Sequence, residues 1–147
     1  IDYLRDIGLA PGLVCIEITE GLLMDSRPEV ASKLLLFRDA GIQVSLDDFG
    51  TGYSAMSYLK KFDIDFLKID KSFVRDLTTD TTDRAIAEAI IAMAHKLGLQ
   101  VIAEGVETQE QRALLSDAGC NFAQGYLFAR PMPLAAFEDF LCAADVQ

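Results

Sequence analysis

Zinc-binding and disulfide-forming residues are scarce in this sequence. Its 147 residues include one histidine and three cysteines, Cys15, Cys120 and Cys142. An odd number of cysteines without the spacing of metal ligands excludes a disulfide framework, and we expect buried, reduced thiols of a cytosolic domain. The single histidine, His95, lies within a helical pattern, so no His or Cys cluster indicates zinc.

Basic residues are also few. The 13 Lys and Arg residues compare with 23 Asp and Glu residues, which gives a net charge of -10. Because phosphate contacts need clustered Lys and Arg, this balance argues against binding of DNA or RNA polymers through a basic face. A small phosphorylated ligand stays open, because bound cations could neutralise its charge.

Targeting, membrane and nucleotide-loop signals are missing as well. The sequence has no signal peptide and no unbroken apolar run of about 18 residues, so we expect a cytoplasmic protein without membrane contact from this segment. It has no GxGxxG or GxxxxGK(S/T) motif, so the phosphate cradles of dinucleotide-binding and P-loop proteins are absent. With 51% apolar residues and a mean hydropathy of +0.24, the chain is long enough for one domain with a core.

Apolar runs of strand length alternate with helical patterns along the whole chain. Short loops between such elements predict parallel βαβ units with right-handed crossovers, and the apolar strand runs predict burial on both faces of the sheet. We expect strands within residues 13–20, 42–50, 65–74, 99–107 and 122–132, and helices at 28–41, 54–62, 82–98, 108–119 and 134–145.

Polar side chains gather where each of these strands is expected to end. In a parallel barrel the C-terminal strand ends open on one face, where the active sites of such barrels lie. For any one residue, a helix cap or a solvated loop acid remains an equal alternative. Five neighbouring strands together favour a site made of Glu17, Glu20, Asp47, Asp48, Lys68, Asp70, Glu104, Glu107 and Gln124.

The adjacent aspartates Asp47 and Asp48 indicate a bound cation. Two carboxylates side by side repel each other, and their desolvation at the end of a buried strand has to be offset. Hard oxygen ligands suit Mg²⁺ or Mn²⁺. Asp47 could bridge two such ions roughly 4 Å apart, an arrangement that activates water for phosphoryl displacement. Lys68 would then be a fixed cation near the water or the phosphate.

A glycine-rich loop follows the two aspartates. A bend at Gly50 would turn Asp48 towards the second ion, and Gly50, Thr51 and Gly52 could form a flexible loop that closes on the ligand.

Five motifs resemble the successive strand-end motifs of the EAL domain family, which hydrolyses cyclic di-GMP to linear pGpG. They are "EITE", "DDFGTGYS", "FLKIDKSFV", "VIAEGVET" and "QGYLFARPMP", in the family's order through nearly the entire chain. The resemblance implies a TIM-type (β/α) barrel in bacterial second-messenger signalling. It further implies a need for Mg²⁺ or Mn²⁺ and inhibition by Ca²⁺.

The resemblance also implies a role for each matching residue. Glu17 and Asp47 would ligate the first metal, and Asp47, Asp48 and Glu104 the second. Lys68 would contact the catalytic water, and Glu20 would brace the loop that starts at Asp48. Glu107 and Gln124 would lie behind the ligands or against the substrate.

Two family features have no counterpart in these residues: the Glu-Ala-Leu strand and a later asparagine, each of which supplies a metal ligand. A barrel of this type takes about 250 residues. We therefore expect residues 1–147 to be the C-terminal portion of a single EAL-type barrel with its last five β–α units, in which the first metal site is incomplete.

Two functions fit the sequence. The parent domain could be a cyclic di-GMP phosphodiesterase, because each family position present has the active residue type. Alternatively, the domain could bind cyclic di-GMP or a protein partner without hydrolysis, and for residues 1–147 alone this second function is also expected.

Association with a second copy is the last expectation from the sequence. Five strands cut from a closed barrel would leave unpaired edges at residues 13–20 and 122–129, together with uncovered apolar surface. A homodimer would cover both, or the chain would be ordered only beside the rest of its own domain. Ile86, Ile90 and Met93, on one stripe of the helix at 82–98, could contact the second copy or could simply pack on the sheet.

Overall fold

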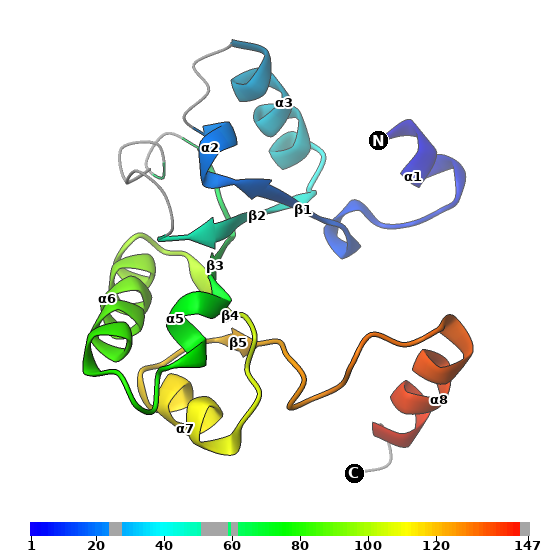
Figure 1. Cartoon of the computed structure of the whole chain (residues 1–147). Helices are drawn as coiled ribbons and strands as arrows, with labels where there is room; N and C mark the ends of the chain where they lie inside the picture. Colours follow the sequence, from blue (N-terminus) through cyan, green and yellow to red (C-terminus); the bar gives the residue numbers. More distant parts are fainter. Residues whose placement is uncertain (24–27, 51–58, 60–61, 145–147) are drawn as a thin grey trace.

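The fold is a curved sheet of five parallel strands with helices packed along it (Figure 1). The computed structural model describes residues 1–23, 28–50, 59 and 62–144. The strand order in the sheet is the order in the sequence, as the alternating pattern predicts for a segment of a (β/α) barrel. The strands are β1 (Cys15–Thr19), β2 (Gln43–Phe49), β3 (Phe66–Ile69), β4 (Gln100–Ala103) and β5 (Phe122–Ala123).

The helices expected at 28–41, 82–98, 108–119 and 134–145 are all present. The one expected at 54–62 lies outside the described residues, apart from Leu59 and Phe62. The described helices are α1 (Asp2–Asp6), α2 (Glu20–Leu23), α3 (Pro28–Asp39), α5 (Lys71–Arg75), α6 (Thr81–Lys96), α7 (Gln109–Asp117) and α8 (Leu134–Ala144), with a 3-10 turn at Pro11–Leu13. None of these helices combines the length and hydropathy needed to cross a membrane.

Three expected strands are shorter than the sequence suggested, and the one expected at 99–107 covers only Gln100–Ala103. Residues 65–74 form a strand only as far as Ile69, because the Asp70 side chain accepts a hydrogen bond from Ser72 N at 2.9 Å and starts α5. The strand within 122–132 ends at Ala123, and the chain then turns at Gly125, whose carbonyl accepts from Phe128 N at 3.1 Å. Local capping and turn chemistry therefore ended β3 and β5.

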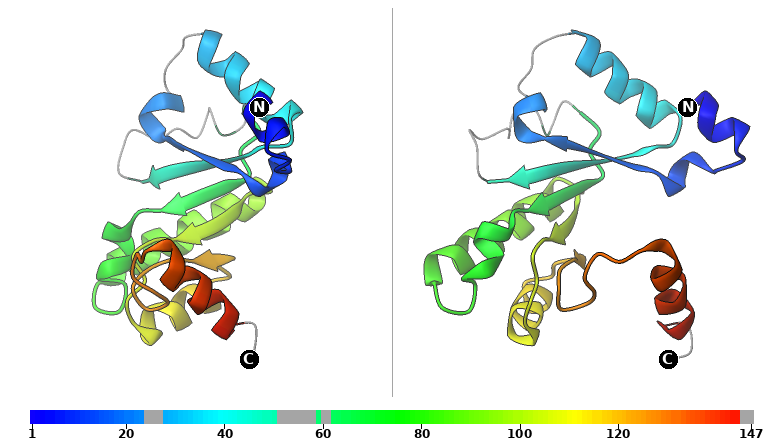
Figure 2. Two further views of the ribbon diagram at one scale, coloured as in Figure 1. Left: turned by 90° about the vertical axis from the view of Figure 1, so that its right-hand side faces the viewer. Right: turned by 45° about the vertical axis from the view of Figure 1, so that its right-hand side comes forward.

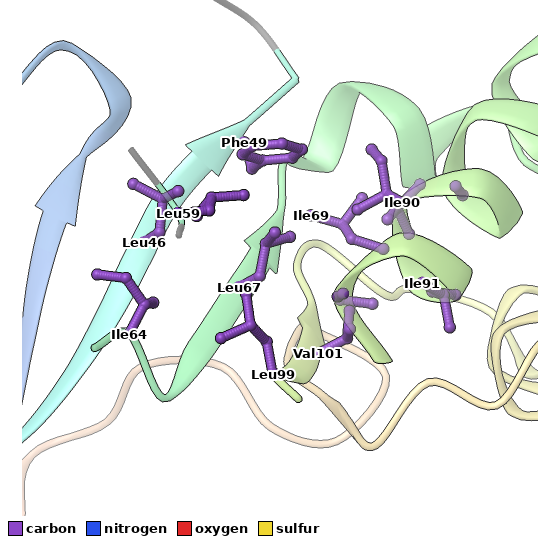
Figure 3. Packing of buried hydrophobic residues seen from close by; sticks show 14 of the residues in the cluster. Leu46, Phe49, Leu59, Ile64, Leu67, Ile69, Ile90, Ile91, Leu99 and Val101 are labelled. Carbon is purple, nitrogen blue, oxygen red and sulfur yellow. The ribbon is translucent and has the colours of Figure 1, made fainter. Parts of the chain in front are cut away.

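The two faces of the sheet have different roles. Side chains alternate along each strand, so Leu46, Leu67 and Val101 share one face, and all three are fully buried. This face packs against Ile90 and Ile91 of α6 to form the core (Figure 3). The alternate residues occupy the opposite face, which carries the polar groups described below.

The apolar stripe of α6 faces the sheet. Ile90 is buried, and Ile86 and Met93 are partly buried against the same core. The proposed use of this stripe as a contact between copies is therefore not supported, and the simpler alternative, packing on the sheet, is observed. Asp80 caps the helix by accepting from Thr82 N at 2.7 Å.

The sheet has two edges, as expected, at β1 and β5. The helices α1 and α8 lie near the two ends of the chain, away from the main helical layer (Figure 2). Exposed apolar side chains here include Tyr3 of α1, Ile7 directly after α1, and Phe137 and Phe140 of α8. β1 is mostly exposed, so burial on both faces holds for β2 and β3 but was a wrong expectation for this edge strand.

The cysteines also differ from expectation. All three are free thiols, but Cys15 and Cys142 are exposed and Cys120 is half-buried. Cys15 lies on the exposed edge strand β1. Cys142 lies on α8, a helix with several exposed apolar side chains. The expectation of buried thiols was wrong because it assumed that both elements are covered.

Gly125→Ala tests the turn after β5. A Cβ at this position would overlap the backbone N and O of Val106, and neither is the mobile end of a side chain. We expect urea unfolding to show a loss of roughly 3 kcal/mol in the free energy of unfolding, the range of overpacked cores. Gly21→Ala is the matched control, because no atom lies within 4 Å of its Cβ position, and it should be neutral or stabilising. Equal effects for the two variants would contradict the close approach.

Candidate functional site

A buried lysine lies at the centre of the polar face. Lys68 on β3 is 3% exposed, and its Nζ lies between three carboxylates. The distances are 2.6 Å to Glu104 Oε1, 2.8 Å to Glu17 Oε1 and 3.0 Å to Asp47 Oδ1. The carboxylates come from β1, β2 and the residue directly after β4, so the sheet brings together four of the residues that the sequence selected.

Strand alternation explains this convergence. Glu17, Asp47 and Lys68 alternate with the buried outward residues Ile18 and Leu46, so their side chains point to the inner face of the curved sheet. Parallel pairing aligns the C-terminal ends of the strands at one rim. The polar residues therefore meet although they are far apart in the sequence.

The carboxylates keep Lys68 charged. Burial by itself would lower the pKa of Lys68, but hydrogen bonds to Glu104, Glu17 and Asp47 outweigh burial and raise the pKa above its ordinary value. The side chain is therefore an ammonium at neutral pH. It can donate hydrogen bonds and supply positive charge, but it cannot act as a general base.

A β-bulge places the second aspartate. Leu46 pairs with Leu67 and Phe49 with Ile69, so β2 has one extra residue between these two pairs. Asp48 adopts a φ of 54°, a left-handed conformation that aspartate tolerates better than most residues. In a regular strand Asp47 and Asp48 would point to opposite faces. The bulge lets both carboxylates reach the same rim.

Three carboxylates form a group that could hold a metal ion. Asp47, Asp48 and Glu104 each offer an oxygen atom, and these atoms lie within 4.8 Å of one another. Partial desolvation, followed by the charges of Asp47 and Asp70, raises the pKa of the Asp48 carboxyl above its ordinary value. Glu17 adjoins this group through Lys68. Such crowding of carboxylates is relieved by a hard divalent cation.

A cleft of about 570 Å³ adjoins the carboxylates. Glu107 and Gln124, both selected from the sequence, lie in its wall, and Gln124 Nε2 donates to Glu104 Oε1 at 2.6 Å. Lys68 donates to the same oxygen, so Glu104 is held from two sides.

Sequence reasoning missed several residues of this cleft wall. Arg130 lies over the Tyr126 ring at 4.4 Å from its centroid, and Lys71 and Phe137 also line the cleft. Arg130 and Tyr126 belong to the quoted motif "QGYLFARPMP", which was the available signal. Lys71 directly follows Asp70 but was assigned to a strand.

The remaining predicted positions lie around the loop after β2. Glu20, at the start of α2, is 5% exposed, and α2 contacts both β1 and β2. Gly50 has a φ of 98°, and a Cβ there would lie 2.9 Å from Phe73 Cε2, so a glycine is required. Thr51 and Gly52 lie outside the described residues.

Curated proteins with similar sequences are named as signalling enzymes. The chain is 49% identical over 140 residues to "Cyclic di-GMP phosphodiesterase NbdA" of Pseudomonas aeruginosa, a match that covers 95% of this chain and 18% of that protein. It is 47% identical over 123 residues to "Cyclic di-GMP phosphodiesterase PdeR" of Escherichia coli, covering 84% of this chain and 19% of that one. The chain thus spans about a fifth of the length of these curated relatives.

Solved structures with the same fold include EAL proteins. The EAL enzyme Bd1971, bound to cAMP and cyclic di-GMP, matches with a TM-score of 0.91 and 38% identity over 95% of this chain and 37% of that one. The EAL domain of Mycobacterium smegmatis DcpA matches with a TM-score of 0.90 and 40% identity, over 97% of this chain and 63% of that one.

A third structure contains metal and nucleotide. Klebsiella pneumoniae BlrP1, in a calcium and cyclic di-GMP complex, matches with a TM-score of 0.80 and 39% identity over 88% of this chain and 33% of that one. A manganese complex of the same protein matches with a TM-score of 0.81. The fold is therefore that of a TIM-type barrel, of which these residues form five parallel strands and their helices. The family model described as "EAL domain" matches residues 1–131, and the chain belongs to the EAL domain family.

Proposed function

We propose that these residues belong to a metal-dependent phosphodiesterase domain that hydrolyses cyclic di-GMP to linear pGpG. One observation carries the proposal: Asp47, Asp48 and Glu104 gather their oxygen atoms within 4.8 Å beside the buried ammonium of Lys68. The names of the relatives NbdA and PdeR support the same activity and substrate.

The metal in this proposal is Mg²⁺ or Mn²⁺. A single ammonium among four carboxylates leaves the rim net negative, and carboxylate oxygens are the ligands that these ions prefer. Asp47, Asp48 and Glu104 would hold one ion, and Glu17 with Asp47 would contribute to a second. The manganese complex of BlrP1 supports this choice of ion class. When bound, such ions lower the pKa of water and neutralise phosphate charge.

The chain's own residues orient the reaction. In the hydrolysis a water oxygen forms a bond to phosphorus, the bond from phosphorus to the 3′ oxygen breaks, and that oxygen gains a proton. Lys68 keeps its proton, so we assign it to orient the water and to stabilise charge on the phosphoryl oxygens. The proton of the water then passes to a carboxylate or to solvent.

The cleft suits a nucleotide. Tyr126 and Phe137 offer aromatic surface, and Lys71 and Arg130 offer positive charge, next to the acidic rim. Bases stack on aromatic rings, and phosphates pair with cations. We place part of the cyclic di-GMP in this cleft, with Glu107 and Gln124 along its wall.

We infer that residues 1–147 are the C-terminal portion of one EAL-type barrel. The five strands form an arc with edges at β1 and β5, whereas a TIM-type barrel closes with eight. The match to 63% of the DcpA EAL domain supports the same inference. A non-hydrolysing module remains the alternative for residues 1–147 alone, but the retained carboxylates favour the enzyme for the complete domain.

Asp47→Asn in the complete domain tests the metal centre. The amide removes the charge that Asp47 contributes to the ions and to Lys68, so we expect kcat for pGpG release to fall by ~10³-fold or more. Asp117→Asn is the matched control, since Asp117 is exposed at the end of α7. Turnover close to wild type in the Asp47 variant would reject the metal assignment.

Glu20→Ala tests the role of the loop after β2. Because Glu20 is buried beside β2 and lies outside the carboxylate group, we expect kcat to fall while the affinity for Mn²⁺ is retained. Calorimetric titration with Mn²⁺ separates the two effects. Loss of a bound ion in this variant would instead make Glu20 a metal ligand.

We propose further that the 147-residue chain by itself associates into a homodimer or a larger species. Among the described residues, β1 and β5 each pair with one strand only, and apolar side chains of α1 and α8 are exposed. Light scattering should therefore give a mass above 16.1 kDa. A monodisperse monomer with one cooperative melting transition would refute the association.

A further inference from the structure

Gln111 joins two segments of the chain through four hydrogen bonds. Its side chain is 5% exposed, although glutamine is usually a surface residue. Its Oε1 accepts from Glu107 N at 2.8 Å and from Thr108 N at 2.9 Å. Its Nε2 donates to Val74 O and to Arg75 O, both at 3.1 Å. The amide group thus uses both its acceptor and its donors.

The two segments joined by Gln111 follow β3 and β4, next to Lys68 and Glu104, the ion pair at the centre of the site. Val74 and Arg75 are the last residues of α5, which begins two residues after Ile69 and three after Lys68. Glu107 and Thr108 end the segment that follows β4 and starts with Glu104. Gln111 therefore connects the helix after Lys68 to the loop after Glu104.

The loop at 104–108 also makes backbone hydrogen bonds and close contacts with three other segments. Glu104 N donates to Ile69 O at 3.1 Å, and Val106 N donates to Gln124 O at 3.0 Å. Gly105 lies so close to Lys71 that a Cβ would be 2.7 Å from Lys71 Cβ. The loop is therefore a tightly packed strap, and Gln111 holds its far end against α5.

Loss of this amide would be costly at both ends. The carbonyls of Val74 and Arg75 lie in the last turn of a short helix, where the regular i to i+4 hydrogen bonds end. Val74 O also accepts from the turn after the helix, including Leu77 N at 3.3 Å, so Arg75 O depends more on Gln111. The amides of Glu107 and Thr108 precede α7 and need an acceptor for the same reason. Leaving such groups unpaired favours movement of the strap away from α5.

We propose that Gln111 is a positioning residue that sets the distance of Glu104 and Glu107 from Lys68. The proposal rests on the metal-dependent activity proposed above and assigns Gln111 no contact with metal or substrate. The 2.6 Å contact between Lys68 and Glu104 joins the two segments at one end, and Gln111 joins them at the other. Movement of the strap would displace a proposed metal ligand.

The experiment compares four variants of the complete domain. Gln111→Met keeps the side-chain volume and removes all four hydrogen bonds. Gln111→Glu keeps the acceptor for Glu107 and Thr108 but loses both donors to α5. Gln109→Met is the matched control on the same helix, where the side chain is exposed. Thr108→Ala removes only the helix cap, in which Thr108 Oγ1 accepts from Gln111 N at 3.2 Å.

Three quantities are measured for each variant: the dissociation constant of Mn²⁺ by electron paramagnetic resonance titration, kcat and KM for cyclic di-GMP, and the melting temperature. We expect Gln111→Met to weaken Mn²⁺ binding by roughly 10- to 100-fold, the range for residues that support metal ligands, and to lower kcat more than it raises KM. Gln111→Glu should also weaken Mn²⁺ binding, although its added negative charge would by itself strengthen it.

The controls separate positioning from general stability. Thr108→Ala should lower the melting temperature and leave Mn²⁺ affinity unchanged, and Gln109→Met should change neither. Wild-type Mn²⁺ affinity in folded Gln111→Met would overturn the proposal. If that variant does not fold, Gln111→Glu decides in the same way. Weak binding in Thr108→Ala as well would assign the effect to helix stability and also overturn it. Absence of Mn²⁺ binding in the wild type would instead reject the proposed function.

Discussion

The arrangement of this domain depends on one buried ammonium. Nζ of Lys68 on β3 lies 2.6–3.0 Å from carboxylate oxygens of Glu17, Asp47 and Glu104, so β1, β2 and the segment after β4 are all tied to β3. An unpaired charge at 3% exposure would cost several kcal/mol, and pairing with three carboxylates offsets this cost. The carboxylates in turn could not lie so close together without a cation. Each part of the cluster therefore requires the others.

The apolar core between the sheet and α6 keeps this cluster in place. Leu67 directly precedes Lys68 on β3 and pairs with Val101 on β4, and both apolar side chains are fully buried in the core with α6. Burial of this face fixes the register of the sheet, because a slip of one residue would turn every side chain to the wrong side. The same alternation that builds the core thus aims Asp47 and Lys68 at the inner face.

Departures from regular structure lie next to the site. The bulge in β2 and the left-handed conformation of Asp48 place two consecutive carboxylates at one rim. Gly105 and Gly125 allow the strap after β4 and the turn after β5 to approach their neighbours more closely than a Cβ would permit. Local strain and close packing of this kind are typical of sites where geometry is set precisely by surrounding structure.

The sequence by itself determined the parallel α/β order and selected the residues that meet around Lys68, because strand periodicity and the position of strand ends are local properties. It also predicted a metal ion at the Asp47–Asp48 pair, and both residues belong to the carboxylate group that could hold one. Only the tertiary structure decided which face α6 buries, how Gln124 reaches Glu104, and that Gln111 links α5 to the loop after β4. These contacts join residues 20 or more positions apart. A periodic pattern shows that a face is apolar or that a residue is polar, but the partner depends on how the strands align in space.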